Sequence, residues 1–132
     1  MRCEVGGVWR PMSLKSYRDL LVWQKAMDLV VACYRITALL PKNETYGLVN
    51  QIQRAAVSVP ANIAEGHGRD HLGDYLHHLS VANGSLMELE THLLLLPRLS
   101  YLKSSELGNG LRTTDEIGKM LSGLSKSLRT TS

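Results

Sequence analysis

The sequence predicts an all-α protein, namely an antiparallel up-down four-helix bundle with a kinked second helix. Three observations lead to this prediction. Apolar residues recur at steps of three and four along most of the 132-residue chain, which is the period of an amphipathic helix. Proline and glycine divide this pattern into four segments joined by short loops, and short loops favour antiparallel neighbours. No stretch shows the alternation that is typical of a half-buried strand.

Residues 1–13 are predicted to form a flexible tail outside the bundle. They show no apolar period and contain two glycines and a proline, which interrupt helices. Met12 stands directly before the periodic region and is an alternative start of the natural protein. The bundle is accordingly expected to occupy residues 14–128, with residues 129–132 frayed at the C-terminus.

The first helix is predicted from about Tyr17 to Leu40, because Pro41 disfavours helical geometry at the residue before it. Two adjacent apolar stripes run along this segment, so more than one neighbour is expected to cover it. One stripe comprises Leu20, Trp23, Met27, Val30 and Tyr34. The other comprises Val22, Ala26, Leu29, Cys33, Ile36 and Leu40.

The second helix is predicted from Asn43, a good capping residue, to Gly66. Pro60 lies inside this segment, and its ring removes a backbone hydrogen bond and clashes with the preceding turn. We therefore expect a kink at Pro60. Gly66 and Gly68 are expected to end the helix.

The third helix is predicted from a cap at Asp70 to about Tyr101. Its apolar positions alternate between steps of three and four, which is the seam of a helix in a coiled-coil-like bundle. They are Leu72, Tyr75, Leu79, Ala82, Leu86, Leu89, Leu93 and Leu96.

The fourth helix is predicted from a cap at Ser104 or Ser105 to Leu128. It contains four glycines, each of which costs about 0.8–1 kcal/mol relative to alanine in a helix interior. This helix is therefore expected to be the least stable of the four. Its glycines are Gly108, Gly110, Gly118 and Gly123, and its apolar positions are Leu107, Leu111, Ile117, Leu121, Leu124 and Leu128.

One side of the second helix has an unusual polar composition for a solvent-facing surface. A turn of about 100° per residue places five polar side chains in one arc, and the segment contains no lysine. Amide, hydroxyl and guanidinium groups form hydrogen bonds when they are buried. We expect another subunit or a ligand to cover this polar stripe; a solvated face is the alternative. The polar stripe comprises Gln51, Arg54, Ser58, Asn62 and Glu65.

The run QIQRAAVSVPANIAEGHGR (Gln51–Arg69), with YGL before it and GSLMELE (Gly84–Glu90) after it, resembles the bacterial four-helix-bundle proteins encoded in 23S rRNA intervening sequences. LLVWQKAMDLV (Leu20–Val30) is similar too, and the resemblance covers about residues 17–128. It implies a homo-oligomer, with a five-fold ring as the expected form, and no established catalytic activity. The same family includes accessory proteins of diversity-generating retroelements, which associate with nucleic acid and a reverse transcriptase.

The resemblance implies structural roles for residues of the second helix. The polar stripe would form a polar network, Pro60 would supply the kink and Gly66 the helix stop. Arg69 stands four residues after Glu65, the spacing of neighbours on one helix face. Gly66 and Gly68 between them are expected to break that geometry.

Histidines near the start of the third helix suggest a metal site. His71, Asp74 and His78 share a face, and His67 precedes them. The close-spaced ligand pairs typical of zinc sites are missing, however, so we expect no metal and no cofactor. Cys33 lies on an apolar stripe, and the sequence contains no nucleophile elbow and no phosphate-binding loop. An enzyme is therefore not expected.

Positive charge is concentrated at both ends of the chain, and the formal net charge is +3. Residues 1–42 contain seven Lys/Arg and three acids, residues 43–96 two and six, and residues 97–132 six and three. If the fold groups the first and last helices, it creates a basic surface. Phosphate contacts are expected from Arg18, Lys25, Arg35, Arg98, Lys103, Arg112, Lys119 and Lys126.

These patterns predict a non-enzymatic homo-oligomer that binds RNA or DNA without reading sequence, because no motif for base readout is present. The alternative is a scaffold that holds a protein partner and never contacts nucleic acid. No apolar stretch is long enough to span a membrane, and no secretory leader is recognised. With only two cysteines, the expected location is the cytoplasm.

Overall fold

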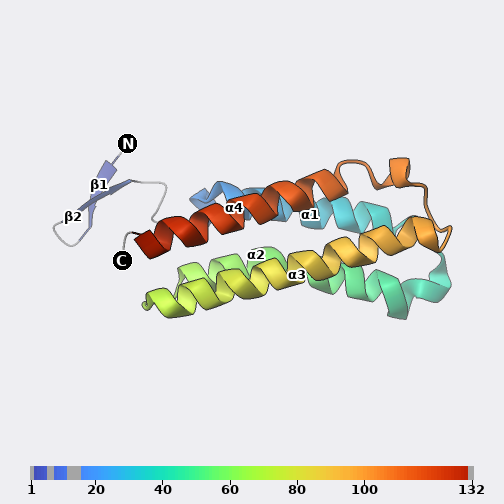
Figure 1. The fold of residues 1–132 in the computed structure, drawn as a ribbon, viewed down its shortest axis with the longest axis horizontal. Coiled ribbons are helices and arrows are strands. Elements are labelled where there is room, and N and C mark those ends of the chain that lie inside the picture. The colour runs from blue at the N-terminus through green and yellow to red at the C-terminus, as the bar shows by residue number, and fades with distance from the viewer. Residues whose placement is uncertain (1, 6–7, 12–15, 131–132) are drawn as a thin grey trace.

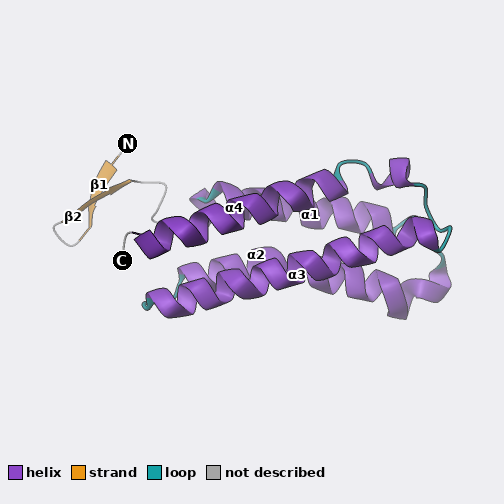
Figure 2. Cartoon of the chain, viewed as in Figure 1, coloured by secondary structure: helices purple, strands orange, loops and turns teal. Residues whose placement is uncertain are grey.

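The computed structural model describes residues 2–5, 8–11 and 16–130, and the all-helical fold class is confirmed (Figure 1). Four antiparallel helices form two layers, with α1 beside α4 and α2 beside α3 (Figures 1 and 2). Short helical turns η2 (Tyr17–Asp19), η3 (Lys42–Glu44), η4 (Thr45–Val49) and η5 (Ser104–Leu107) precede or connect them. The four helices are α1 (Leu21–Thr37), α2 (Asn50–His67), α3 (Leu72–Arg98) and α4 (Gly110–Thr130).

Two short strands precede the bundle, where the sequence pattern predicts none. Strands β1 (Arg2–Val5) and β2 (Val8–Pro11) are antiparallel, and Val5 pairs with Val8. Val5, Val8 and Trp9 in these strands are β-branched or aromatic residues, which are enriched in strands. Met12, the alternative start, lies outside the described residues, as do residues 131–132 at the C-terminus.

The core is aliphatic and follows the predicted stripes. The α1 stripe that runs from Val22 to Leu40 is buried along its length, and so are the six positions of the α3 seam from Leu79 to Leu96. The second stripe of α1 is different, because Met27 remains 43% exposed.

The break in the second helical segment lies at Gly47, whereas Pro60 lies inside α2 with its ring buried. Gly47 has non-helical backbone angles (φ −107°, ψ −110°) between the η turns and α2. A Cβ atom there would lie 2.6 Å from Glu44 Oε1, the oxygen that accepts a hydrogen bond from the Leu48 backbone N–H. Glycine therefore makes room for a carboxylate that caps this segment, and α2 proper starts at Asn50 instead of near Asn43.

The prediction that Gly66 ends the second helix is wrong, because α2 continues through it to His67. Gly66 is buried against α3, where an added Cβ would lie 2.7 Å from His78 Cβ and 3.2 Å from the Tyr75 carbonyl oxygen. The residue thus permits a close approach of two helices. Gly68 takes the C-cap position.

The fourth helix starts later than predicted. Gly108 adopts φ +58°, a left-handed conformation that glycine tolerates. This residue separates the turn η5 from α4, which begins at Gly110. The cap of α3 also differs by one residue, since His71 and not Asp70 occupies it.

Candidate functional site

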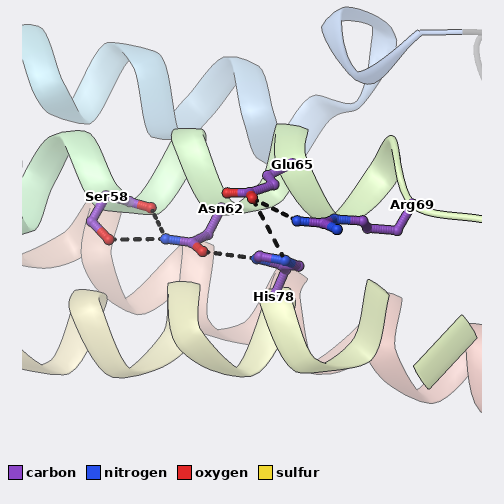
Figure 3. Close-up of polar contacts among 5 residues, drawn as sticks. All are labelled: Ser58, Asn62, Glu65, Arg69 and His78. Atoms are coloured by element: carbon purple, nitrogen blue, oxygen red, sulfur yellow. Dashed lines mark hydrogen bonds and ion pairs between the residues drawn. The ribbon is translucent and has the colours of Figure 1, made fainter. Parts of the chain in front are cut away.

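Part of the polar stripe forms a hydrogen-bonded chain between α2 and α3 (Figure 3). The Ser58 and Ser85 hydroxyls lie 2.8 Å apart. Asn62 Nδ2 donates to the Ser58 carbonyl oxygen (2.9 Å) and to its Oγ (3.0 Å). Asn62 Oδ1 lies 3.0 Å from His78 Nδ1. Because the amide oxygen only accepts, His78 Nδ1 carries the hydrogen in this arrangement.

An ion pair continues this chain toward the end of α2. Arg69 Nη2 lies 2.9 Å from Glu65 Oε1, and His78 Nε2 lies 4.0 Å from the same oxygen (Figure 3). The expectation that Gly66 and Gly68 break the Glu65–Arg69 pairing is wrong, because α2 continues past Gly66.

The chain's own third helix covers two residues of the polar stripe. Ser58 and Asn62 are partly buried and find partners on α3, while Gln51, Arg54 and Glu65 are exposed on the single protomer. The sequence pattern singles out His78 only as a possible metal ligand, and it does not single out Ser85. Their seven-residue spacing beside the apolar seam was the signal that could have identified them, since it places both on one side of α3.

At the other end of the polar stripe, α2 and α3 line an open groove with a volume of about 330 Å³. Arg54 from α2 and Glu88 from α3 line it, and no ion pair joins them within the described part of the chain. We call it the α2–α3 groove; its lining residues are Asn50, Gln51, Arg54, Ala55, Ser58, Ser85 and Glu88.

Between α1 and α2 lies a second groove of about 390 Å³, which shares Asn50, Arg54 and Ser58 with the α2–α3 groove. Tyr34 and Val57 also line this second groove and are 47% and 43% exposed. Met27 and Val31 precede Tyr34 at helical spacing, and both are also exposed. We call these four apolar residues the α1–α2 apolar face. Exposed apolar groups that cluster in this way are typical of protein contact sites.

The fold brings six of the eight basic candidates into one layer. Lys25 pairs with Glu116 (2.7 Å) between α1 and α4, and Lys119 pairs with Asp115 (3.4 Å) on α4. Arg98 lies instead in the last turn of α3, and Lys103 precedes η5. The six are Arg18, Lys25, Arg35, Arg112, Lys119 and Lys126.

Charge differs between the two layers of the bundle. The α1–α4 layer, residues 16–37 and 104–130, contains seven Lys/Arg and five acids. The α2–α3 layer, residues 42–98, contains four Lys/Arg and six acids. The first layer is therefore net positive and the second net negative.

The surroundings shift the pKa values of several titratable groups, among them Glu116 and Cys33. The hydrogen bond from Lys25 is the main cause that lowers the pKa of Glu116. Burial raises the pKa of Cys33 to about 12, so the thiol stays protonated in the native state.

Neither metal coordination nor membrane crossing is indicated by the described residues. No three His, Cys, Asp or Glu side chains among them gather closely enough to hold a metal ion. His71 and Asp74 are exposed, and His78 instead bonds Asn62. No helix in the same part of the chain is both long and apolar enough to cross a membrane.

The fold and these features define a helical-bundle protein whose candidate recognition surfaces lie on the outside of four packed helices. Residues 18–123 match the family described as 23S rRNA-intervening sequence protein, and the chain belongs to this family. The family prediction is thereby confirmed.

A solved structure shares the fold. It is the crystal structure of a protein with unknown function from the S23 ribosomal protein family of Bacteroides thetaiotaomicron VPI-5482. The TM-score is 0.73 and the sequence identity 27%, over 80% of this chain and 99% of that chain. No curated protein matches the sequence.

Proposed function

We propose that this protein is a homo-oligomeric four-helix bundle that binds RNA or DNA, without reading sequence, through its α1–α4 layer. The supporting observation is the separation of charge between the two layers. A polyanion is attracted more strongly to the net-positive layer than to the net-negative one. The family's accessory proteins of diversity-generating retroelements, which associate with nucleic acid, agree with this proposal.

The basic residues of α4 suit contact with a phosphate backbone. Arg112, Lys119 and Lys126 follow one another at seven-residue intervals, so they lie about 10 Å apart along one side of the helix. Lys119 is paired with Asp115, but both side chains are exposed. Such a pair contributes only about 0–1 kcal/mol, which leaves the lysine available to a phosphate.

Self-association multiplies these charges. One copy offers few basic groups, and a ring of copies pools them so that a long strand contacts several at once. The α1–α2 apolar face is the surface proposed for this contact, because aromatic, methionine and apolar side chains are enriched at protein interfaces. The family resemblance implies five copies, and the cytoplasm remains the expected location.

Salt-dependent binding tests the proposed nucleic-acid contact. A fluorescently labelled single-stranded RNA is titrated with wild type and with R112Q/K119Q/K126Q, and anisotropy is followed at several salt concentrations. The slope of log affinity against log salt should fall by about 2, since each lost single-strand contact removes about 0.7.

The matched control removes equal charge from the other layer, in K42Q/R69Q/R98Q. Its salt slope should remain close to that of wild type. Equal loss in both variants would show that only net charge matters, and no complex at low salt would favour the protein scaffold instead.

Light scattering tests the self-association. Val31→Asn should reduce the solution mass while helical circular dichroism stays unchanged. Leu94→Asn, on an exposed α3 position outside the α1–α2 apolar face, should keep the wild-type mass. A wild-type mass equal to one chain would overturn the proposed oligomer.

A further inference from the structure

We propose that the α2–α3 groove binds the guanine base of an unpaired nucleotide, with Arg54 and Glu88 as the residues that recognise it. This inference rests on the proposed nucleic-acid function. It adds a base preference that contacts with phosphates alone do not supply.

The α2–α3 groove holds two opposite charges apart. Arg54 and Glu88 line the same groove from different helices, yet no ion pair joins them in the described chain. Arg54 makes no side-chain hydrogen bond there either, and its side chain is exposed. The guanidinium is therefore available to a ligand.

The floor of the groove is preorganised. The 2.8 Å contact between Ser58 and Ser85 joins the two helices, and Asn62 donates to Ser58 from the next turn. Glu88 Oε1 lies 3.4 Å from His92 Nε2, and the His92 side chain is only 13% exposed. The two helices and the Glu88 carboxylate are thus positioned before a ligand arrives, which lowers the entropy cost of binding.

The lining chemistry restricts what the groove accepts. A simple anion would meet the Glu88 carboxylate, and a simple cation would meet the Arg54 guanidinium. A suitable ligand therefore presents hydrogen-bond acceptors and donors side by side, with no strong net charge at that point.

Guanine has this pattern. Its O6 and N7 atoms accept hydrogen bonds, and arginine contacts this pair in a bidentate manner more often than any other base edge. Its N1–H and N2–H₂ groups donate on the adjacent Watson–Crick edge, where a carboxylate such as Glu88 accepts. Adenine presents an amino donor where guanine has O6, so it would place donor against donor at Arg54.

The recognised base must be unpaired. Contact with Glu88 uses the Watson–Crick edge, which is occupied in a duplex, and proteins read RNA sequence mostly at single-stranded bases. The exposed amides of Asn50 and Gln51 at the groove offer further hydrogen bonds to such a nucleotide.

Base analogues in a short RNA test the proposal. A labelled oligo-adenosine strand carries one central guanosine, inosine or 7-deazaguanosine, and anisotropy gives the affinity of the oligomeric protein for each. Inosine lacks the N2 amine that faces Glu88, and 7-deazaguanosine lacks the N7 that faces Arg54. Guanosine should bind about 5- to 100-fold more tightly than either analogue, the range of one bidentate contact.

Glu88→Gln should bring the guanosine-to-inosine ratio close to one without lowering the affinity for oligo-adenosine. Glu90→Gln is the matched control, because it makes the same charge change two residues away on another side of α3. The control should retain the wild-type ratio.

The remaining outcomes show whether the guanine site alone is wrong or the proposed nucleic-acid binding as well. Equal affinity for the three strands overturns the guanine site and leaves the phosphate contacts standing. If no strand binds, guanosine monophosphate is titrated against inosine monophosphate and followed by amide chemical shifts of the α2–α3 groove. No difference between the two nucleotides then overturns the site. A lower solution mass of Glu88→Gln, without a guanosine preference in wild type, would assign the groove to a second copy.

Discussion

Replacement of Gly66 by alanine tests the close approach of α2 and α3. The new Cβ would lie 2.7 Å from His78 Cβ, 3.1 Å from Tyr75 Cδ1 and 3.2 Å from the Tyr75 carbonyl oxygen. A Cβ and a backbone oxygen do not rotate away, so the helices must separate. Overpacking of this kind costs typically 1–3 kcal/mol, and alanine regains about 1 kcal/mol of helix propensity.

The net effect should be a destabilisation of about 0–2 kcal/mol, with a fall in Tm of up to roughly 8 °C for a bundle of this size. The assay is thermal unfolding followed by circular dichroism at one protein concentration, so that oligomer formation contributes equally. Gly84→Ala is the control, because nothing lies within 4 Å of its added Cβ in α3. That variant should gain about 1 kcal/mol. A Gly66→Ala variant that gains stability as Gly84→Ala does would refute the close-approach interpretation.

Three further predictions concern the polar chain and the shifted groups. Asn62→Ala should lower the free energy of unfolding by about 1–3 kcal/mol, because its partners on both helices lose their hydrogen bonds. Denaturant titration of wild type and the variant measures this difference in unfolding free energy. The pKa of Glu116 lies below its ordinary 4.5 in the folded state, so its pair with Lys25 stabilises above that pH and is lost on acidification. The stability difference between wild type and Glu116→Gln should therefore shrink below about pH 4.5, as pH-dependent melting would show. In a Cys3→Ser background, Cys33 should not react with a thiol reagent at pH 8 until the chain unfolds, because its native pKa is about 12; rapid labelling of the folded protein would contradict its burial.

The apolar pattern predicts most of the fold because burial repeats with the helical period. The α3 seam illustrates this, since each of its positions from Leu79 to Leu96 is buried as its spacing indicates. A single sequence contains that information locally, without knowledge of the partner helix.

The glycines show where the sequence is ambiguous. Gly47 makes room for a carboxylate, Gly66 permits a helix contact, and Gly108 adopts a positive φ. The missing Cβ serves all three purposes, so the residue type alone does not distinguish a helix end from a close approach. Only the neighbour in space decides between them.

The polar stripe also shows that residue type alone does not identify the neighbour in space. Its composition indicates that Ser58 and Asn62 need partners, but it does not identify them. The partners on α3 follow from which sides of two helices face each other, and that is a tertiary property. Arg54 has no such partner among the residues that the structure describes, so its role depends on a group outside the protomer.

The hydrogen bond from Tyr101 to Glu44 (2.7 Å) has a consequence for local unfolding. It ties the connection after α3 to the connection before α2, although the two residues are 57 positions apart in the sequence. Amide protons in both connections should therefore exchange with solvent in one concerted opening. The same hydrogen bond raises the pKa of Tyr101, so its contribution is lost only when the pH rises through that elevated value. In strong alkali, this end of the molecule should be the first to loosen.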